Sequence, residues 1–205
     1  MYKFGQVEIQ SKNFNGVYKV TDTVDLDKIR VSKGVEANKH DTRYIIGYEV
    51  ELGKIVPLYI RTPNNCSSSG VSRYDMNSPW KMGFNVSEDK AWVQVYQAIF
   101  SKIEELLDQK LEGEPLNNGK YINPKLITWD DEIKTTFNGN LIDKLKSIGS
   151  CNAIGVLKIG SVYRKGSNYH LQVFLKECKF KKRDSTFDSQ LNGYEVDSGC
   201  YDTIY

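Results

Sequence analysis

Two long β-forming segments near the C-terminal end constrain the fold more than any other feature. Residues 153–164 read AIGVLKIGSVYR and residues 169–182 read YHLQVFLKECKFKK, and both are rich in β-branched, aromatic and aliphatic side chains. The sequence Lys165-Gly166-Ser167-Asn168 between them is typical of a tight turn. The sequence therefore predicts a long β-hairpin around which the rest of the chain has to fold.

The second segment of this hairpin has two faces. Leu171, Val173 and Leu175 predict a face toward the core, and the alternate positions point the other way: His170, Gln172, Phe174 and Lys176. Cys178 and Phe180 break this alternation, because they are apolar but share the parity of the outward-facing residues. The break predicts a β-bulge or the end of regular pairing.

Three further strands are expected before this hairpin. Residues 43–52 and 55–62 predict a second hairpin, with its turn at Gly53-Lys54. The stretch 63–79 is dense in Ser, Asn, Pro and Gly and predicts a long loop. Residues 80–86 predict the third strand.

Residues 88–111 predict an amphipathic helix. Ser87 is a suitable N-cap, and Gly113 and Pro115 follow the last turn. Apolar side chains recur at three- and four-residue spacing, which indicates a stripe that faces the core: Trp92, Val95, Tyr96, Ile99, Ile103, Leu106 and Leu107. A shorter helix is expected at 140–149.

The order strand, strand, strand, helix, strand, strand predicts a β-rich α+β fold. It is the element order of an OB-like five-stranded barrel, whose helix lies between the third and fourth strands. Residues 1–40 would add N-terminal extension strands, and 114–150 would be an elaboration between strands. The length of 205 residues fits one domain over 1–183, followed by an acidic tail at 184–205.

Charge is distributed unevenly, although the net charge is only +2. Residues 184–205 hold five acidic residues and no Lys or Arg, and removing them leaves a chain of net charge +7. Residues 158–183 hold eight basic residues against one Glu. A basic segment beside an acidic tail indicates an anionic partner, with the tail as a protein-interaction arm or a competitor. A solvated charged face is the competing interpretation.

Four scattered cysteines, with no Cys-x-x-Cys spacing, indicate free thiols in a reducing intracellular compartment. The two histidines are far apart in the sequence, so neither a metal site nor a cofactor is expected. The first residues, MYKFGQVEIQ, lack the apolar run of a leader, and no apolar segment is long enough for a membrane span. We expect neither secretion nor membrane insertion.

Catalytic motifs are nearly absent. Residues 113–121 depart from phosphate-loop spacing, and no Gly-x-Ser-x-Gly sequence is present. An acidic cluster with a lysine is compatible with a Mg²⁺-dependent nuclease, but such clusters arise often by chance: Asp130, Asp131, Glu132 and Lys134. We therefore expect no enzymatic activity, with a nuclease as the less favoured alternative.

Cationic and aromatic side chains interleave along the predicted strands and loops, which favours binding of single-stranded nucleic acid. Cations neutralise phosphates, and rings stack on bases of any identity. The candidate phosphate contacts are Arg61, Arg73, Lys81, Arg164, Lys165, Lys176, Lys179, Lys181, Lys182 and Arg183. The candidate stacking rings are Tyr59, Tyr74, Trp80, Tyr163, Tyr169 and Phe174. For each ring, a place in the core or on a sheet face is the competing interpretation.

A longer pattern spans about residues 40–183. It runs from KIVPLYIRTPNNCSSSGV through WKMGFNV and the helix to VLKIGSVYRKGSNYHLQVFLKECKFKK, followed by the acidic tail. In this pattern the chain resembles the single-stranded-DNA-binding OB proteins of large cytoplasmic DNA viruses, of the poxvirus and asfarvirus type. The resemblance implies sequence-independent binding of single-stranded DNA in viral replication or recombination, without catalysis, in the host cytoplasm or nucleus.

The partners follow from this hypothesis. Single-stranded DNA is expected, and RNA is also compatible, because stacking and phosphate contacts do not require a 2′-hydroxyl. The acidic tail is expected to contact replication proteins, and self-association stays open. The main alternative is a structural or assembly protein that acts through protein–protein contacts.

Overall fold

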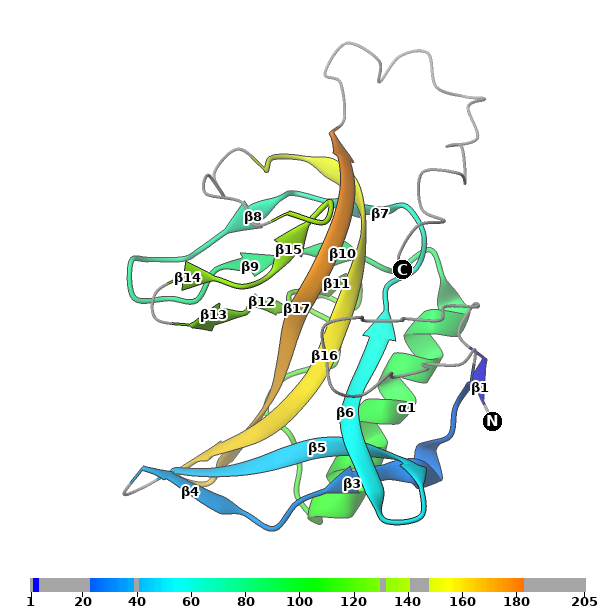
Figure 1. Ribbon diagram of the computed structural model, residues 1–205, viewed down its shortest axis with the longest axis vertical. Helices are drawn as coiled ribbons and strands as arrows, with labels where there is room; N and C mark the ends of the chain where they lie inside the picture. The colour runs from blue at the N-terminus through cyan, green and yellow to red at the C-terminus, as the bar shows by residue number, and fades with distance from the viewer. Residues whose placement is uncertain (1, 4–22, 39–40, 130–131, 141–147, 183–205) are drawn as a thin grey trace.

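A long, bent β-hairpin forms the centre of the computed structural model, which describes residues 2–3, 23–38, 41–129, 132–140 and 148–182 (Figure 1). The strands β16 (Cys151–Lys165) and β17 (Asn168–Lys182) pair antiparallel along their length. Gly166 in the turn has a φ of 61°, a conformation that favours glycine. The hairpin predicted from the sequence is confirmed.

The ladder between β16 and β17 contains two irregularities. Val156 pairs with Glu177 whereas Leu157 pairs with Leu175, so Lys176 is an extra residue on β17. Leu175 and Cys178 are both fully buried, three positions apart, because the extra residue reverses the alternation between them. The break predicted at Cys178 is therefore a bulge. A second bulge makes Gly160 the extra residue on β16.

The other edge of β16 is paired by three strands in succession. β5 (Asp41–Glu51), β6 (Lys54–Arg61) and β7 (Cys66–Ser68) each cover a different part of it. β5 and β6 also pair with each other, which confirms the second predicted hairpin. Five small elements precede them. β1 (Tyr2–Lys3) and β2 (Thr23–Val24) pair with each other, the 3-10 helix η1 (Leu26–Lys28) follows, and β3 (Ile29–Val31) and β4 (Val35–Asn38) both pair with β5.

Short strands extend the sheet beyond β17. β12 (Lys125–Leu126) and β15 (Thr136–Phe137) pair with β17 in parallel. β9 (Lys81–Met82) pairs with β12 on one side and with β8 (Val71–Ser72) on the other. β10 (Phe84–Asn85) pairs with both β7 and β11 (Tyr121–Ile122). β13 (Thr128–Trp129) and β14 (Glu132–Ile133) form a separate pair.

The one α-helix of the described residues, α1 (Lys90–Leu107), lies beside β3 and β6 (Figure 1). Its N-cap is Asp89 rather than Ser87, because the Asp89 carboxylate accepts a hydrogen bond from the backbone N–H of Trp92 at 2.9 Å. Asp108 ends the helix in a left-handed conformation, with a φ of 51°. The predicted apolar stripe is buried except at its end, where Leu106 is exposed and Leu107 is half-buried.

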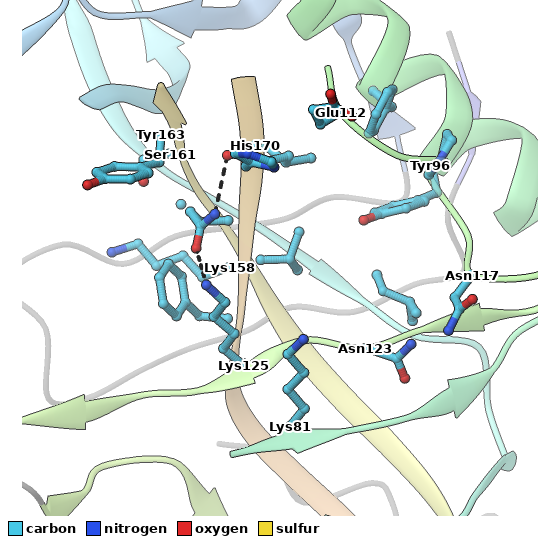
Figure 2. A pocket seen from close by; sticks show the side chains of 18 of the residues that line it. Lys81, Tyr96, Glu112, Asn117, Asn123, Lys125, Lys158, Ser161, Tyr163 and His170 are labelled. Carbon is cyan, nitrogen blue, oxygen red and sulfur yellow. Dashed lines mark hydrogen bonds between the residues drawn. The ribbon is translucent and has the colours of Figure 1, made fainter. Parts of the chain in front are cut away.

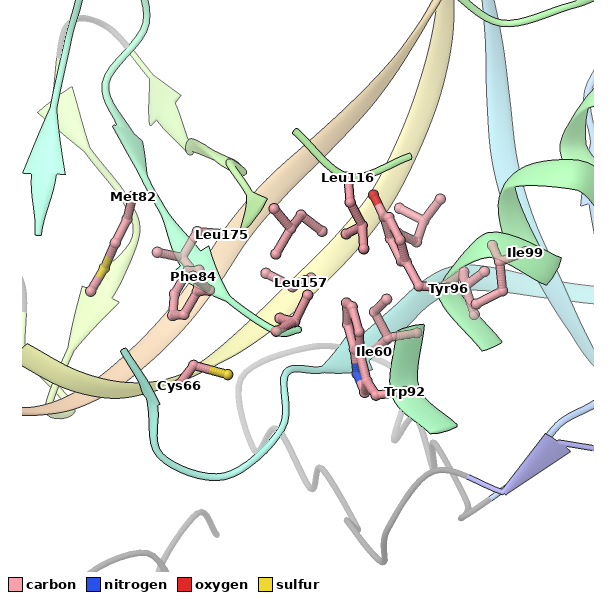
Figure 3. Packing of buried hydrophobic residues seen from close by; sticks show 14 of the residues in the cluster. Ile60, Cys66, Met82, Phe84, Trp92, Tyr96, Ile99, Leu116, Leu157 and Leu175 are labelled. Carbon is pink, nitrogen blue, oxygen red and sulfur yellow. The ribbon is translucent and has the colours of Figure 1, made fainter. Parts of the chain in front are cut away.

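The apolar core joins the helix to both long strands (Figure 3). Trp92 and Tyr96 of α1 pack near Ile60 and Leu157, while Phe84 and Leu175 fill the part farther from the helix. A Cβ on Gly155 of β16 would lie 2.8 Å from the Phe84 ring, so only glycine allows this close approach. Burial of each large side chain contributes about 1.5–3 kcal/mol.

Three expectations differ from the structure. The OB-like barrel is not confirmed, because the sheet is open over the described residues. The predicted strand 80–86 divides at Gly83 into β9 and β10, which pair with different neighbours. The predicted loop 63–79 holds β7 and β8 and contributes buried side chains, including Cys66. The coarser class, a β-rich α+β fold, is what the structure shows.

Three other expectations lie largely outside the described residues. The helix expected at 140–149 falls mostly on undescribed positions, and so do most of the residues before 23. The acidic tail at 184–205 is also outside the described part. No helix in the described part combines the length and apolar character needed to cross a membrane.

Candidate nucleic-acid interface

A row of directly opposed residues crosses five neighbouring strands. Lys158 of β16 stands opposite Tyr59 of β6 on one side and opposite Phe174 of β17 on the other. Phe174 in turn stands opposite Lys125 of β12, and Lys125 stands opposite Lys81 of β9. We call these five residues the cross-strand row. Opposed residues share one face of a sheet at a spacing of about 5 Å, so the Phe174 ring has a lysine on each side.

The cross-strand row borders a cavity of about 1010 Å³ (Figure 2). Four of its residues line the cavity: Lys81, Lys125, Lys158 and Phe174. Arg43 adds a fourth basic side chain, whereas the acidic lining side chains are Glu112 and Glu114, on the segment that follows α1. Pockets for single small molecules measure about 300–1,000 Å³, so this cavity has room for a larger ligand or a segment of one.

Lys125 is held in place without an acidic partner. Its Nζ donates a hydrogen bond to Oε1 of Gln172, and Nε2 of Gln172 donates to the backbone oxygen of His170 at 3.3 Å (Figure 2). Burial lowers the pKa of Lys125, and repulsion from Lys81 lowers it further. The ammonium group is therefore positioned by a neutral amide, and its charge is left for a ligand.

Lys158 is in a similar position on β16. Burial lowers the pKa of Lys158, and repulsion from Lys176 at the bulge adds to this effect. Within the described part of the chain, Lys81, Lys125 and Lys158 make no ion pair. Partly buried cations without counter-charges cost folding free energy, and an anionic ligand would compensate for that cost.

Phe174 lies against Gly160, the extra residue of the second bulge. A Cβ on Gly160 would lie 2.8 Å from Cε2 and 2.9 Å from Cδ2 of the Phe174 ring, so the ring covers the glycine backbone. The bulge and the glycine together give the ring its place between Lys158 and Lys125. A ring that packs on the backbone with one face can stack a base on its other face, while the lysines beside it contact the phosphates.

The structure brings only some of the predicted site residues to this cavity. Lys81, Phe174 and Tyr163 line it, and the Tyr163 hydroxyl donates to the Asp41 carboxylate. Tyr59 belongs to the cross-strand row but is only 8% exposed, so its ring offers little open face for stacking. This corrects the stacking role expected for Tyr59.

Two other groups of predicted residues lie outside the cavity lining. At the tip of the central hairpin, the Arg164 guanidinium lies 5.9 Å from the centre of the Tyr169 ring, with Lys165 beside them. In the β8–β9 loop, Arg73 lies 4.6 Å from the centre of the Trp80 ring, and Tyr74 is 97% exposed. Each group pairs a cation with a ring. Trp80 directly precedes Lys81 of the cross-strand row, whereas the group at the hairpin tip lies farther along β16 and β17 from the row.

The remaining predicted cations are dispersed. Lys181 and Lys182 are exposed at the end of β17, about 25 Å along the strand from Phe174. Lys176 and Lys179 are partly buried nearer to it, and Arg183 lies outside the described residues. Arg61 is also partly buried, which lowers its pKa, and its backbone oxygen accepts a hydrogen bond from Nε1 of Trp92 at 2.6 Å. Arg61 therefore takes part in the packing of α1 against β6 through its backbone oxygen, and it does not line the cavity.

Sequence reasoning missed several cavity residues. Lys158 could have been identified as a candidate, since it is the only charged residue in the apolar run from 153 to 163. Lys125 could not have been identified in this way, because the segment around it has no periodicity and its strand is two residues long. Arg43 and Gln172 looked like ordinary polar positions of strands.

The described residues show no arrangement of side chains that supports the nuclease alternative. Glu132 and Lys134 form an ion pair with each other, and Asp130 and Asp131 are outside the described residues. The described positions contain no group of three His, Cys, Asp or Glu side chains arranged to hold a metal ion. Cys66, Cys151 and Cys178 are buried, and burial raises the pKa of Cys66 to about 12, so this thiol is unsuited to nucleophilic chemistry.

Comparisons with known proteins add no family assignment. No protein-family model matches the sequence, and a search of the curated proteins found no similar one. The function is therefore inferred from the chemistry of the cavity and its cross-strand row.

Proposed function

We propose that this chain is a sequence-tolerant, non-enzymatic single-stranded nucleic-acid-binding protein that acts in DNA replication or recombination. The observation that carries the proposal is the cross-strand row, in which Phe174 lies between Lys158 and Lys125, with Lys81 beyond them. A single strand in the cavity would stack a base on Phe174 while neighbouring phosphates meet the lysines. Each stacked base contributes about 1–3 kcal/mol regardless of its identity.

The same arrangement favours a single strand over a duplex. A ring on the wall of a cavity can stack only on a base whose face is open, and the bases of a duplex are already stacked on each other. The lysine ammonium groups, by contrast, contact phosphates of any nucleic acid. The ring therefore supplies the preference for single strands, and the lysines supply much of the affinity.

The finer parts of the proposal rest on the sequence. The order of the two hairpins around the helix supports an OB-like relationship, although the sheet is open over the described residues. The resemblance to viral single-stranded-DNA-binding proteins supports a role in viral replication, within a reducing compartment of the host cell. The acidic tail supports a contact with replication proteins.

Equilibrium titration of fluorescent 30-mers tests the proposal. Oligo-dT, oligo-rU and a duplex of the same length are titrated at several salt concentrations, with anisotropy as the signal. If the four basic side chains of the cavity each meet a phosphate, log K falls against log salt with a slope of about −2.8 for the single strands. Absence of binding at low salt, salt-independent binding, or equal affinity for the duplex would contradict the proposal.

A second candidate function, an assembly protein, is favoured by one observation. Three exposed apolar side chains lie on adjacent strands: Val35 on β4 is 57% exposed, Ile45 on β5 is 55% exposed and Ile55 on β6 is 57% exposed. Light scattering of the nucleic-acid-free protein over a range of concentrations distinguishes the two candidates. Assembly without nucleic acid, combined with no oligonucleotide binding, would favour this second function.

A further inference from the structure

Tyr96 is a core residue whose hydroxyl reaches the cavity. The residue is 3% exposed, and its ring stacks on that of Trp92, with centroids 5.1 Å apart and an interplanar angle of 11°. Trp92 is itself held by the hydrogen bond from its Nε1 to the Arg61 backbone oxygen. Two aromatic rings on successive turns of α1 therefore fix the direction of the Tyr96 hydroxyl, which points into the cavity in Figure 2.

The Tyr96 hydroxyl has no hydrogen-bond partner among the described residues. Burial alone raises the pKa of Tyr96, so the group is a neutral phenol. No fully buried side-chain oxygen or nitrogen of the described residues lacks a hydrogen-bond partner, so the Tyr96 oxygen is open to the cavity and not sealed in the core. A ligand in the cavity can therefore donate or accept a hydrogen bond at this oxygen.

Two carboxamides line the same cavity. Asn117 and Asn123 lie on the segment between α1 and β12, and neither side-chain amide hydrogen-bonds to another described residue. A Cβ on Gly83 would lie 2.9 Å from Oδ1 of Asn123, so glycine at this position leaves room for the amide. The hydroxyl and the two amides are neutral, and each can both donate and accept a hydrogen bond.

This chemistry differs from that of the cross-strand row. Ammonium groups suit phosphates, whereas neutral groups that both donate and accept match the edges of nucleobases, where donors and acceptors alternate. We propose that Tyr96, Asn117 and Asn123 form a subsite that hydrogen-bonds the edge of one nucleobase. This inference rests on the proposed function: the strand is held without regard to sequence at Phe174, and a base preference arises at this one position.

The substitution Tyr96→Phe tests the subsite, because it removes one oxygen and keeps the stacked ring. Its affinities for 30-mers of dT, dC and dA, and for an abasic 30-mer, are compared with those of the unaltered protein. We expect a loss of about three- to tenfold for at least one base, an unchanged affinity for the abasic strand, and a melting temperature that is unchanged or higher. Tyr44→Phe, the same change on β5 outside the cavity lining, is the matched control.

Asn123→Ala, at an exposed position, provides a second variant and is expected to weaken binding of the same base. Equal affinities of Tyr96→Phe and the unaltered protein for all three bases would overturn the subsite, as would an equal loss on the abasic strand. The same titration with 30-mers of rU and dU tests for a ribose contact. An affinity loss in Tyr96→Phe for rU but not for dU would overturn the subsite in favour of such a contact. If the unaltered protein binds no oligonucleotide at low salt, the proposed function itself fails, which is a separate result.

Discussion

Lys125 and Lys81 stand directly opposite each other on β12 and β9, and neither makes an ion pair within the described residues. Like charges at opposed positions destabilise a sheet by up to about 1 kcal/mol. Partial burial of Lys125 adds to this cost and lowers its pKa. A fold that retains such a pair loses stability that a ligand of opposite charge restores, which is typical of binding sites.

Replacement of Lys125 by glutamine should therefore increase the stability of the fold and weaken nucleic-acid binding. We expect Lys125→Gln to raise the free energy of unfolding by about 0.2–1 kcal/mol, because the repulsion is removed. The slope of log K against log salt for oligo-dT should become shallower by about 0.7, because one phosphate contact is lost. Urea unfolding and salt-dependent anisotropy measure the two effects. Lys33→Gln, an exposed position outside the cavity lining, should change neither quantity; a stability loss in Lys125→Gln with unchanged binding would refute the assignment.

The Phe174 ring should contribute more to affinity than any other side chain in the cavity. We expect Phe174→Ala to weaken oligo-dT binding by about 1–3 kcal/mol, since one stacking surface is lost. Gly160→Ala should have a smaller effect in the same direction, because a Cβ at 2.8 Å displaces the ring while every charge is kept. Trp129→Ala removes a 70% exposed ring outside the cavity lining and serves as the control for both variants. Equal losses in Phe174→Ala and Trp129→Ala would show that the ring has no special role.

Binding should weaken with rising pH earlier than it does for ordinary lysines. The pKa values of Lys125 and Lys158 are lowered by burial and by neighbouring lysines, and a bound phosphate favours their protonated forms. Affinity for oligo-dT should therefore fall as the pH rises through these lowered pKa values, below the usual lysine value of about 10.4. The double variant Lys125→Arg, Lys158→Arg keeps its charge at these pH values and should bind without this decline.

The free protein should show the opposite trend. Because the folded-state pKa of each of these two lysines is below the unfolded value, their protonated forms destabilise the fold. The free energy of unfolding should therefore rise as the pH increases from the lowered pKa toward the unfolded value of about 10.4. A melting temperature in the double arginine variant that follows the same pH curve as the unaltered protein would contradict this origin.

Removal of residues 184–205 should tighten DNA binding if the acidic tail competes with nucleic acid. The deletion raises the net charge from +2 to +7, because it removes five acidic residues and no basic one. We expect a lower dissociation constant for oligo-dT and a steeper salt dependence. A variant in which the five acidic residues are replaced by Asn and Gln separates charge from length. If the affinity for DNA and for replication proteins is unchanged in both variants, the tail has neither role.

Local sequence patterns predicted the elements whose signals lie within one segment. The alternation of Leu171, Val173 and Leu175 and its reversal at Cys178 predicted the face of β17 and its bulge, because the pleat of a strand has a period of two. Three- and four-residue spacing predicted α1 in the same way. The division of 80–86 at Gly83 was not predictable, since β9 and β10 are set by different partner strands.

The sequence by itself determined the two hairpins, the helix and the outward direction of Phe174, because each depends on neighbours within about 20 residues. Only the tertiary structure decided which lysines accompany that ring. Lys81, Lys125 and Lys158 come from three segments that are distant in sequence, and their register across the sheet depends on long-range pairing. Tyr96 shows the same limit: its helical spacing predicted a core ring, which it is, but only the packing of α1 against the sheet brings its hydroxyl to the cavity.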